Sequence, residues 1–289
     1  MKPAPFDYHA PTTLREAVEL LGGLEDAKVL AGGQSLIPIL AMRLSRFEHL
    51  VDLGRVGELV GIDRTNGTVT VRAMTTYATV EASDVIATGV PLLAKATPLI
   101  GHFQIRNRGT LGGSIAHADP AAEYPAVAVA LDATIEIAGP SGSRHVAASD
   151  FFEATFMTDI TEGEIVTAVH FPVWEGACGF AAEEVARRHG DFALVGVVAG
   201  VQLDGGTVVK AGVALFGVGG IPHRAAAVEA ALVGSAAVGA DLAALGRLVL
   251  DDIDPPGDIH ASGAYRREIA AVLVERALGT AILEASSRA

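Results

Sequence analysis

The chain has 289 residues, of which 50% are apolar and 19% are charged. This composition excludes a disordered chain and predicts a large core, in one large domain or in two to three packed smaller ones. The chain has 21 Lys and Arg residues and 34 Asp and Glu residues, which gives a net charge of −13. This charge argues against nucleic acid and anionic membranes as partners, since both attract cationic surfaces.

Membrane and disulfide signals are missing from the sequence. The longest apolar runs, at 192–202 and 211–221, contain glycines and are shorter than the roughly 18 to 20 residues that a spanning helix needs. The first residues lack the apolar stretch of a secretory signal. The one cysteine, Cys178, cannot form an internal disulfide, nor hold an iron–sulfur cluster, which takes about four thiolates. We therefore expect a cytoplasmic protein without a membrane span.

The first 55 residues alternate between helix and strand signals. A capping box begins at Thr13 and predicts a helix that stops at a glycine pair. Short apolar segments at 28–31 and 49–53 are predicted strands. Ser35 is expected to cap a second helix that runs to about Arg46. These elements predict a small α/β subdomain.

The next hundred residues begin with a hairpin signal. The Asn-Gly pair at 66–67 predicts a type I′ turn between strands at 60–64 and 68–73, because both central positions of that turn need positive φ. The segment 77–99 is predicted to be rich in helix. The segment 104–123 has no clear period, and we expect a long polar loop there.

Strand signals return after this segment. Strands are predicted at 134–138 and 164–171, with a turn at 139–142 and a helix cap at Ser149. A boundary near 172–176 divides the chain into units of 1–174 and 175–289. The second unit is predicted to hold strands at 195–203 and 207–216 and helices at 222–233, 240–250 and 265–284.

Two glycine pairs lie where backbone N–H groups could bind an anion. The pair in 31–35 stands between a buried strand and a helix start, and the pair in 110–114 lies in the polar segment. Without a Cβ, the backbone can approach a phosphate closely. Neither segment has the spacing of the Rossmann fingerprint or of a P-loop. Arg106 and Arg108 are candidates for a phosphate contact or for a partner surface.

The two glycine segments resemble the FAD-binding signatures of the flavoprotein subunits of molybdenum hydroxylases. The segment 29–36 reads VLAGGQSL, and 110–123 reads TLGGSIAHADPAAE. This family includes the medium chain of carbon monoxide dehydrogenase and the FAD domain of xanthine dehydrogenase. The segments 5–8 and 187–193 also match, so that the resemblance covers essentially the whole chain.

The resemblance implies an α+β fold. A two-part FAD-binding domain of the PCMH or vanillyl-alcohol-oxidase type would occupy 1–174, with subdomains of about 1–55 and 56–174. A C-terminal α/β domain of the carbon monoxide dehydrogenase flavoprotein type, with an antiparallel sheet and packed helices, would occupy 175–289.

The resemblance also implies which residues contact the cofactor. The first segment would wrap the pyrophosphate of FAD, the second would form another loop around it, and single residues elsewhere would pack against the cofactor or hydrogen-bond to it. These expected FAD-binding residues are Val29, Leu30, Ala31, Gly32, Gly33, Gln34, Ser35, Leu36, Ile100, Thr110, Leu111, Gly112, Gly113, Ser114, Glu123, Ile165 and Val166.

By the same resemblance, the chain is expected to carry FAD and to pass electrons within a complex. The expected partners are a large molybdopterin-binding subunit and a small subunit with two-iron two-sulfur clusters, in a dimer of heterotrimers. The family's lysine before the paired arginines is absent, and Glu183 and Glu184 lie there instead. The organic substrate and the final electron acceptor stay open. The alternative is a free-standing FAD-dependent oxidoreductase related to vanillyl-alcohol oxidase.

No catalytic residue and no metal site are expected on this chain. His117 and Asp119 are two residues apart and could suggest metal ligands, but the sequence offers no evident third ligand beside them. We expect them to take part in hydrogen bonds of the loop.

Overall fold

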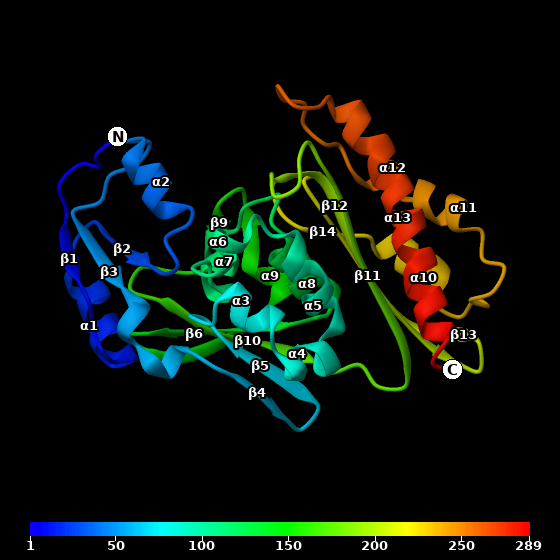
Figure 1. The fold of residues 1–289 in the computed structure, drawn as a ribbon, viewed down its shortest axis with the longest axis horizontal. Helices are drawn as coiled ribbons and strands as arrows, with labels where there is room; N and C mark the ends of the chain where they lie inside the picture. The colour runs from blue at the N-terminus through cyan, green and yellow to red at the C-terminus, as the bar shows by residue number, and fades with distance from the viewer.

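The computed structural model describes all 289 residues, which form four β-sheets with associated helices. Figure 1 shows three parts side by side: a small sheet at the N-terminus, a central sheet covered by helices, and a C-terminal sheet carrying the long last helix. The α+β class expected from the sequence is therefore confirmed. No helix combines the length and the apolar character required to cross a membrane.

The N-terminal part is a three-stranded parallel sheet with two helices. The strands have the order β1-β3-β2. The N-cap Thr13 accepts a hydrogen bond from the backbone N–H of Glu16, as the sequence predicts. The elements are β1 (Asp7–His9), α1 (Leu14–Gly23), β2 (Ala27–Leu30), α2 (Leu36–Ala41) and β3 (His49–Asp52).

The second helix differs from its prediction in two ways. It ends at Ala41 rather than near Arg46, because Arg43 takes a left-handed backbone conformation with φ of 59° that closes the helix. Ser35 does not cap it: its own backbone is already helical, and its hydroxyl accepts no bond from the first turn.

The central part is a five-stranded antiparallel sheet of order β4-β5-β10-β6-β7. Asn66 and Gly67 have φ of 49° and 76°, which confirms the type I′ turn. Two short 3-10 turns, η1 (Leu53–Arg55) and η2 (Gly57–Leu59), lead into it. Its strands are β4 (Ile62–Thr65), β5 (Thr68–Arg72), β6 (Thr134–Gly139), β7 (Gly142–Ala147) and β10 (Ile165–Pro172).

Short helices cover one face of this sheet, and a main core of 35 buried residues lies between them. The remaining elements of this part are α3 (Tyr77–Glu81), α4 (Asp84–Gly89), α5 (Pro91–Ala96), η3 (Thr97–Leu99), α6 (Phe103–Arg106), α7 (Leu111–His117), α8 (Glu123–Ala130), α9 (Ala148–Phe151), β8 (Phe152–Ala154) and β9 (Met157–Thr158).

The expected long loop at 104–123 is wrong, because most of this segment is helical. Thr110 caps α7 by accepting a hydrogen bond from the N–H of Gly113 at 3.2 Å. The buried face of α7 consists of Leu111, Gly112 and Ile115, and a glycine on that face hides the helical period. The predicted cap at Ser149 is also wrong, since the residue lies inside α9 and Ala147 is the N-cap.

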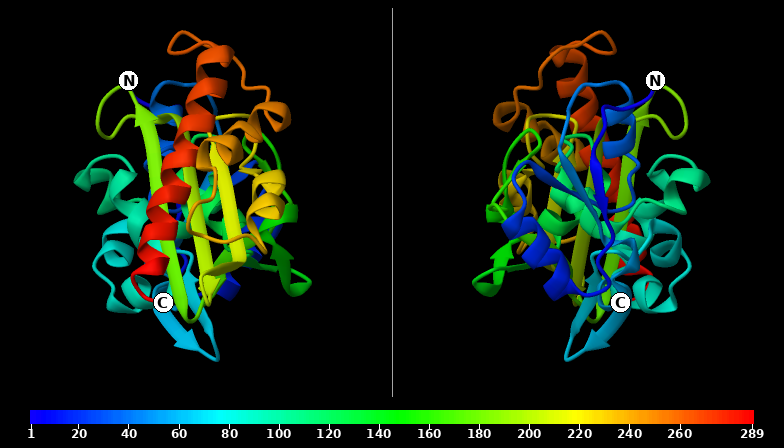
Figure 2. Two further views of the ribbon diagram at one scale, coloured as in Figure 1. Left: turned by 90° about the vertical axis from the view of Figure 1, so that its right-hand side faces the viewer. Right: turned by 90° about the vertical axis from the view of Figure 1, so that its left-hand side faces the viewer.

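The C-terminal part is a four-stranded antiparallel sheet of order β11-β12-β13-β14, and α13 lies across it (Figure 2). The strands predicted at 195–203 and 207–216 are confirmed, whereas β11 was not predicted. The elements are β11 (Ala177–Ala186), β12 (Ala193–Asp204), β13 (Thr207–Phe216), β14 (His223–Arg224), α10 (Ala226–Leu232), α11 (Leu242–Arg247), α12 (Val249–Asp252) and α13 (Gly263–Ser286).

Candidate functional site

The first glycine segment, 31–35, connects β2 to α2 as an open turn. Gly33 has φ of +74°, a left-handed conformation that favours glycine. The five backbone N–H groups of this segment donate to no acceptor within the protein. Consecutive free N–H groups that line one concave turn form a site for an anion.

A pocket of about 430 Å³ opens against this turn. Arg108, two residues before the second glycine segment, reaches this pocket, and its guanidinium forms no ion pair and no hydrogen bond within the protein. The pocket therefore combines free N–H groups with an unpaired positive charge. Its lining residues are Leu30, Ala31, Gly32, Gly33, Gln34, Ile37, Pro38, Asp52 and Arg108.

The two glycine segments lie against each other, although some 75 residues separate them in the sequence. A Cβ on Gly32 would lie 2.2 Å from the carbonyl oxygen of Arg108 and 2.8 Å from the Cα of Gly109. A Cβ on Gly113 would lie 3.4 Å from the Cβ of Ala31. The backbones approach so closely that only glycine fits at Gly32.

The second segment differs from the first because four of its five N–H groups, those of 111–114, already donate to acceptors within the protein. The N–H groups of Leu111 and Gly112 donate to the carbonyls of Thr75 and Ala73. Those of Gly113 and Ser114 donate to Thr110. This segment therefore supports the first one by close packing, and it can contact an anion only through the N–H of Thr110 or through its side chains.

Glu123, at the start of α8, is a buried carboxyl group without a hydrogen-bond partner from another residue. Burial, with a smaller contribution from the nearby carboxyls of Glu184 and Asp119, raises its pKa to about 8. The Oε2 atom of Glu184 is likewise buried without a partner, and burial raises the pKa of Glu184 to about 7. Two such groups suit a polar ligand that supplies the missing hydrogen bonds.

The other expected cofactor residues are spread between surface and core. Leu36 and Ile100 are half-buried. The side chains of Leu111, Ile165 and Val166 are at most 5% exposed, so that protein atoms cover most of their surface. Ile165 belongs to a small cluster at the N-terminal part, where the expected residues Val29 and Ala31 also pack, and Val166 belongs to the main core.

The structure separates the roles of the two arginines near the second segment. Arg106 pairs with Glu81 at 2.9 Å and donates to the carbonyls of Ile100 and Gly101, so it holds the local backbone in place. Arg108 makes no ion pair and no hydrogen bond within the protein, so its charge is available to a ligand.

Sequence reasoning missed Asp52, which lines the pocket. Its position at the carboxyl end of a parallel strand is the signal that could have identified it.

The acidic pair that takes the place of the family's lysine points in two directions. Glu183 lies 3.8 Å from Arg276 of α13, whereas Glu184 lies on the side of Glu123. The guanidinium of Arg187 lies 3.0 Å from the imidazole of His260. His117 stacks on Phe156, with ring centroids 4.9 Å apart.

Comparisons with known proteins agree along the whole chain. Residues 4–174 match the model of the FAD-binding domain in molybdopterin dehydrogenase, and residues 180–281 match that of the CO dehydrogenase flavoprotein C-terminal domain. The chain is 38% identical to the alpha subunit of the 6-hydroxypseudooxynicotine dehydrogenase complex of Paenarthrobacter nicotinovorans, with 98% of this chain and 96% of that protein covered.

Two further relatives come from other complexes. The chain is 37% identical to the carbon monoxide dehydrogenase medium chain of Hydrogenophaga pseudoflava, over 97% of this chain and 98% of the relative. It is also similar to a chain in the crystal structure of quinoline 2-oxidoreductase from Pseudomonas putida 86. That match has a TM-score of 0.94 and 38% identity, and it covers 99% of each chain.

Proposed function

Because the chain belongs to the family of FAD-binding subunits of molybdopterin-dependent dehydrogenases, we propose that it is the electron-transferring medium subunit of a molybdenum hydroxylase complex. The chain is an oxidoreductase subunit whose cofactor is FAD. Its proposed partners are a large molybdopterin-binding subunit and a small subunit with two-iron two-sulfur clusters. We propose that two such heterotrimers associate.

One observation carries this proposal: residues 31–34, whose backbone N–H groups are free, and the unpaired Arg108 line the same pocket. A hydrogen bond to a charged oxygen contributes about 1.5 to 3 kcal/mol. A few of them, with one guanidinium, are enough to hold the pyrophosphate of FAD in an acidic protein. The tight contact between Gly32 and Arg108 keeps these donors together.

In the proposed function, FAD supplies the redox chemistry and the residues of this chain bind and position it. Bound FAD supplies the ability to accept electrons one at a time and to release them as a pair. The glycine segments and Arg108 bind and orient it, and Glu123 is proposed to hydrogen-bond a polar part of it. With one cysteine, the chain cannot hold an iron–sulfur cluster, so in the proposed complex the clusters that deliver electrons belong to a partner.

The binding half of the proposal is tested with Arg108→Gln in the purified chain. The substitution removes the only free cation of the pocket, and we expect the Kd for FAD to rise about tenfold, since a charged hydrogen bond contributes about 1.5 to 3 kcal/mol. Flavin fluorescence measures the affinity. Arg247→Gln, an exposed arginine on α11, is the matched control and should bind FAD like the parent chain. Equal affinity in both variants would reject the pyrophosphate site.

The electron-transfer half is tested in the complex co-purified with its partners. Removal of FAD should leave the iron–sulfur clusters reducible by the substrate of the complex but should stop the reduction of an external acceptor. Turnover of that substrate by the isolated FAD-loaded chain would instead support a free-standing oxidoreductase.

A further inference from the structure

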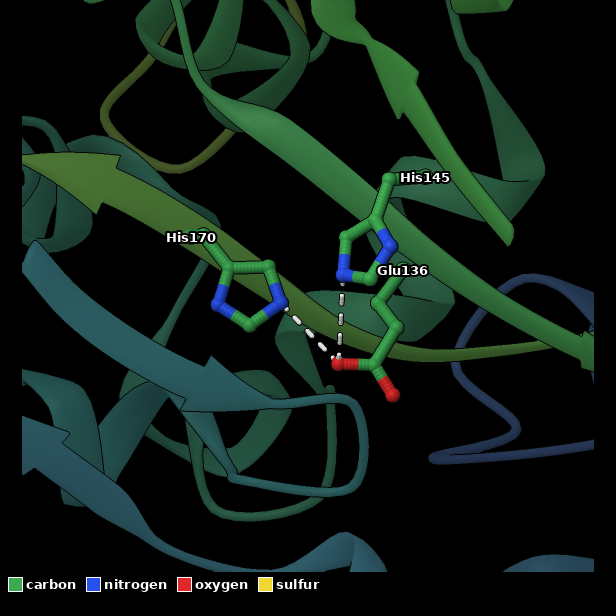
Figure 3. A group of neighbouring side chains, drawn as sticks. All are labelled: Glu136, His145 and His170. Carbon is green, nitrogen blue, oxygen red and sulfur yellow. Dashed lines mark hydrogen bonds and ion pairs between the residues drawn. The ribbon is translucent and has the colours of Figure 1, made fainter. Parts of the chain in front are cut away.

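Three neighbouring strands of the central sheet bring together a carboxylate and two histidines, two of them from one hairpin and the third from a strand later in the chain. Glu136 lies on β6, His145 on β7 and His170 on β10. Figure 3 shows both imidazoles facing the same carboxylate oxygen. The Nε2 atom of His170 is 3.0 Å from Oε2 of Glu136, and that of His145 is 3.9 Å from it. The three ligand atoms all lie within 4.8 Å of one another.

Two hydroxyl groups hold this cluster in orientation. The Nδ1 atom of His170 is 2.9 Å from the hydroxyl of Thr70, so that its Nε2 atom faces Glu136. The hydroxyl of Thr167 donates to Oε1 of Glu136 at 3.0 Å and leaves Oε2 directed at the imidazoles. Such outer hydrogen bonds to ligating histidines and carboxylates are typical of metal sites, where they fix the ring and its tautomer.

The cluster lies on the face of the sheet away from the main core. Ile135 and Ile137, the neighbours of Glu136 on β6, both point into that core, so Glu136 points to the opposite face. Glu136 and His170 are half-buried there, while His145 is 58% exposed at its side chain. A cation can therefore reach the group from solvent, and the exposed imidazole is free to adjust.

We propose that Glu136, His145 and His170 bind one divalent transition-metal cation of the zinc class, with water as the fourth ligand. With bonds of about 2.0 to 2.1 Å, the ligand atoms of a tetrahedral zinc ion lie roughly 3.3 Å apart. The observed 3.0 Å and 3.9 Å to Glu136 lie on either side of that separation, and the two imidazole nitrogens lie within 4.8 Å of each other. A movement of the exposed side chain of His145 would bring all three ligand atoms to the cation.

Proton positions are compatible with binding. For Nε2 of His170 to ligate, a neutral imidazole moves its ring proton from Nε2 to Nδ1 by exchange with solvent, whereas an imidazolium releases its Nε2 proton to solvent. The Nδ1–H then donates to the hydroxyl of Thr70, which can serve as donor or acceptor. The cation would then join β10, β6 and β7 on the open face of the sheet.

The test measures zinc binding by the full chain, loaded with FAD and freed of any affinity tag and of metal. We expect one equivalent of Zn²⁺ by isothermal titration calorimetry, and cobalt as a substitute should give the visible spectrum of a tetrahedral site. Glu136→Gln and His170→Ala should abolish this binding. Thr70→Val should weaken it roughly 10- to 100-fold, and Thr70→Ser should retain it.

The pair of His9 and His49, with ring nitrogens 3.2 Å apart, provides the matched control. His9→Ala should leave zinc binding unchanged. Zinc binding that is lost in His9→Ala but persists in Glu136→Gln would overturn the proposal, as would the absence of stoichiometric binding in the parent chain. The FAD spectrum and circular dichroism report whether each variant is folded. Because the side chain of His145 is exposed, His145→Ala should lose zinc binding and keep both spectra, which separates loss of metal from loss of structure.

Discussion

At the scale of single residues, the unused bonding capacity of a polar group marks the site better than its residue type does. Arg144 is paired with both Asp159 and Glu164, and that arrangement lowers the pKa of Glu164 to about 2. Arg108 and Glu123 have no such partners. Because an unpaired buried group is costly, the carboxyl of Glu123 indicates a bound ligand. Arg108 is exposed, and its free guanidinium marks the site through the pocket that it lines.

The raised pKa of Glu123 predicts how stability depends on pH in the FAD-free chain. The folded chain holds a proton on this carboxyl up to about pH 8, whereas the ordinary pKa is 4.5. The contribution of Glu123 to the free energy of unfolding is therefore full below the ordinary pKa and is lost as the pH rises through about 8. Glu123→Gln, which mimics the protonated group, should be more stable than the parent near pH 8.5, with a smaller difference near pH 5.

Urea denaturation of both chains at the two pH values measures this effect. Glu25→Gln, at an exposed position, is the control and should follow the parent. A stability difference for Glu123→Gln that stays constant with pH would show that the buried carboxyl is ionised throughout.

At the scale of elements, α7 shows how a glycine can serve packing within a helix. A Cβ on Gly112 would lie 2.4 Å from the Cβ of Ala73 and 2.7 Å from its Cα. The N–H of Gly112 also donates to the carbonyl of Ala73. The helix therefore docks directly on the backbone that follows β5, which positions the second glycine segment against the first.

Gly112→Ala tests this packing. Because the added methyl group meets backbone atoms that cannot move aside, we expect a loss of about 1 to 3 kcal/mol in the free energy of unfolding, measured by urea denaturation. The matched control is Gly23→Ala at the end of α1, where a Cβ meets no atom within 4 Å. A smaller loss for Gly112→Ala than for Gly23→Ala would contradict the close contact.

At the scale of the whole molecule, the two units share a core. The main core contains Phe180, Val198 and Phe216 of the C-terminal sheet together with residues of the central helices. Helices α5 and α8 pack against β11, β12 and β13. We propose a unit boundary near residue 174, but the two units depend on each other for burial of apolar surface.

Expression of residues 1–174 alone tests this dependence. We expect the fragment to expose apolar surface and to bind the dye ANS, because the C-terminal sheet no longer covers its helices. Co-expression with residues 175–289 should restore a folded complex that binds FAD. Cooperative unfolding and full FAD affinity of the fragment by itself would contradict the shared core.

Part of the fold and part of the site could be predicted from the sequence because they depend on the conformational preferences of a few adjacent residues. The type I′ turn at Asn66, the cap at Thr13 and the open turn around Gly33 follow from properties of a few adjacent residues. The family resemblance of the two glycine segments, and with it FAD, was likewise readable and agrees with the comparisons. Helix α7 could not be predicted from the apolar pattern of the sequence, because its buried face includes a glycine instead of an apolar side chain.

From the sequence by itself, the cofactor and the fold class followed from the family resemblance of two contiguous segments. The glycine turns followed from local conformational preferences of adjacent residues. Only the tertiary structure decided which donors are free. Whether Arg106 or Arg108 is available depends on the distant Glu81, and the N–H groups of 111–112 are occupied by carbonyls of 73–75. The cluster of Glu136, His145 and His170 likewise exists only because strand pairing sets three separate segments side by side. Hydrogen bonds and ion pairs form between neighbours in space, and the chain order does not specify those neighbours until the core has packed.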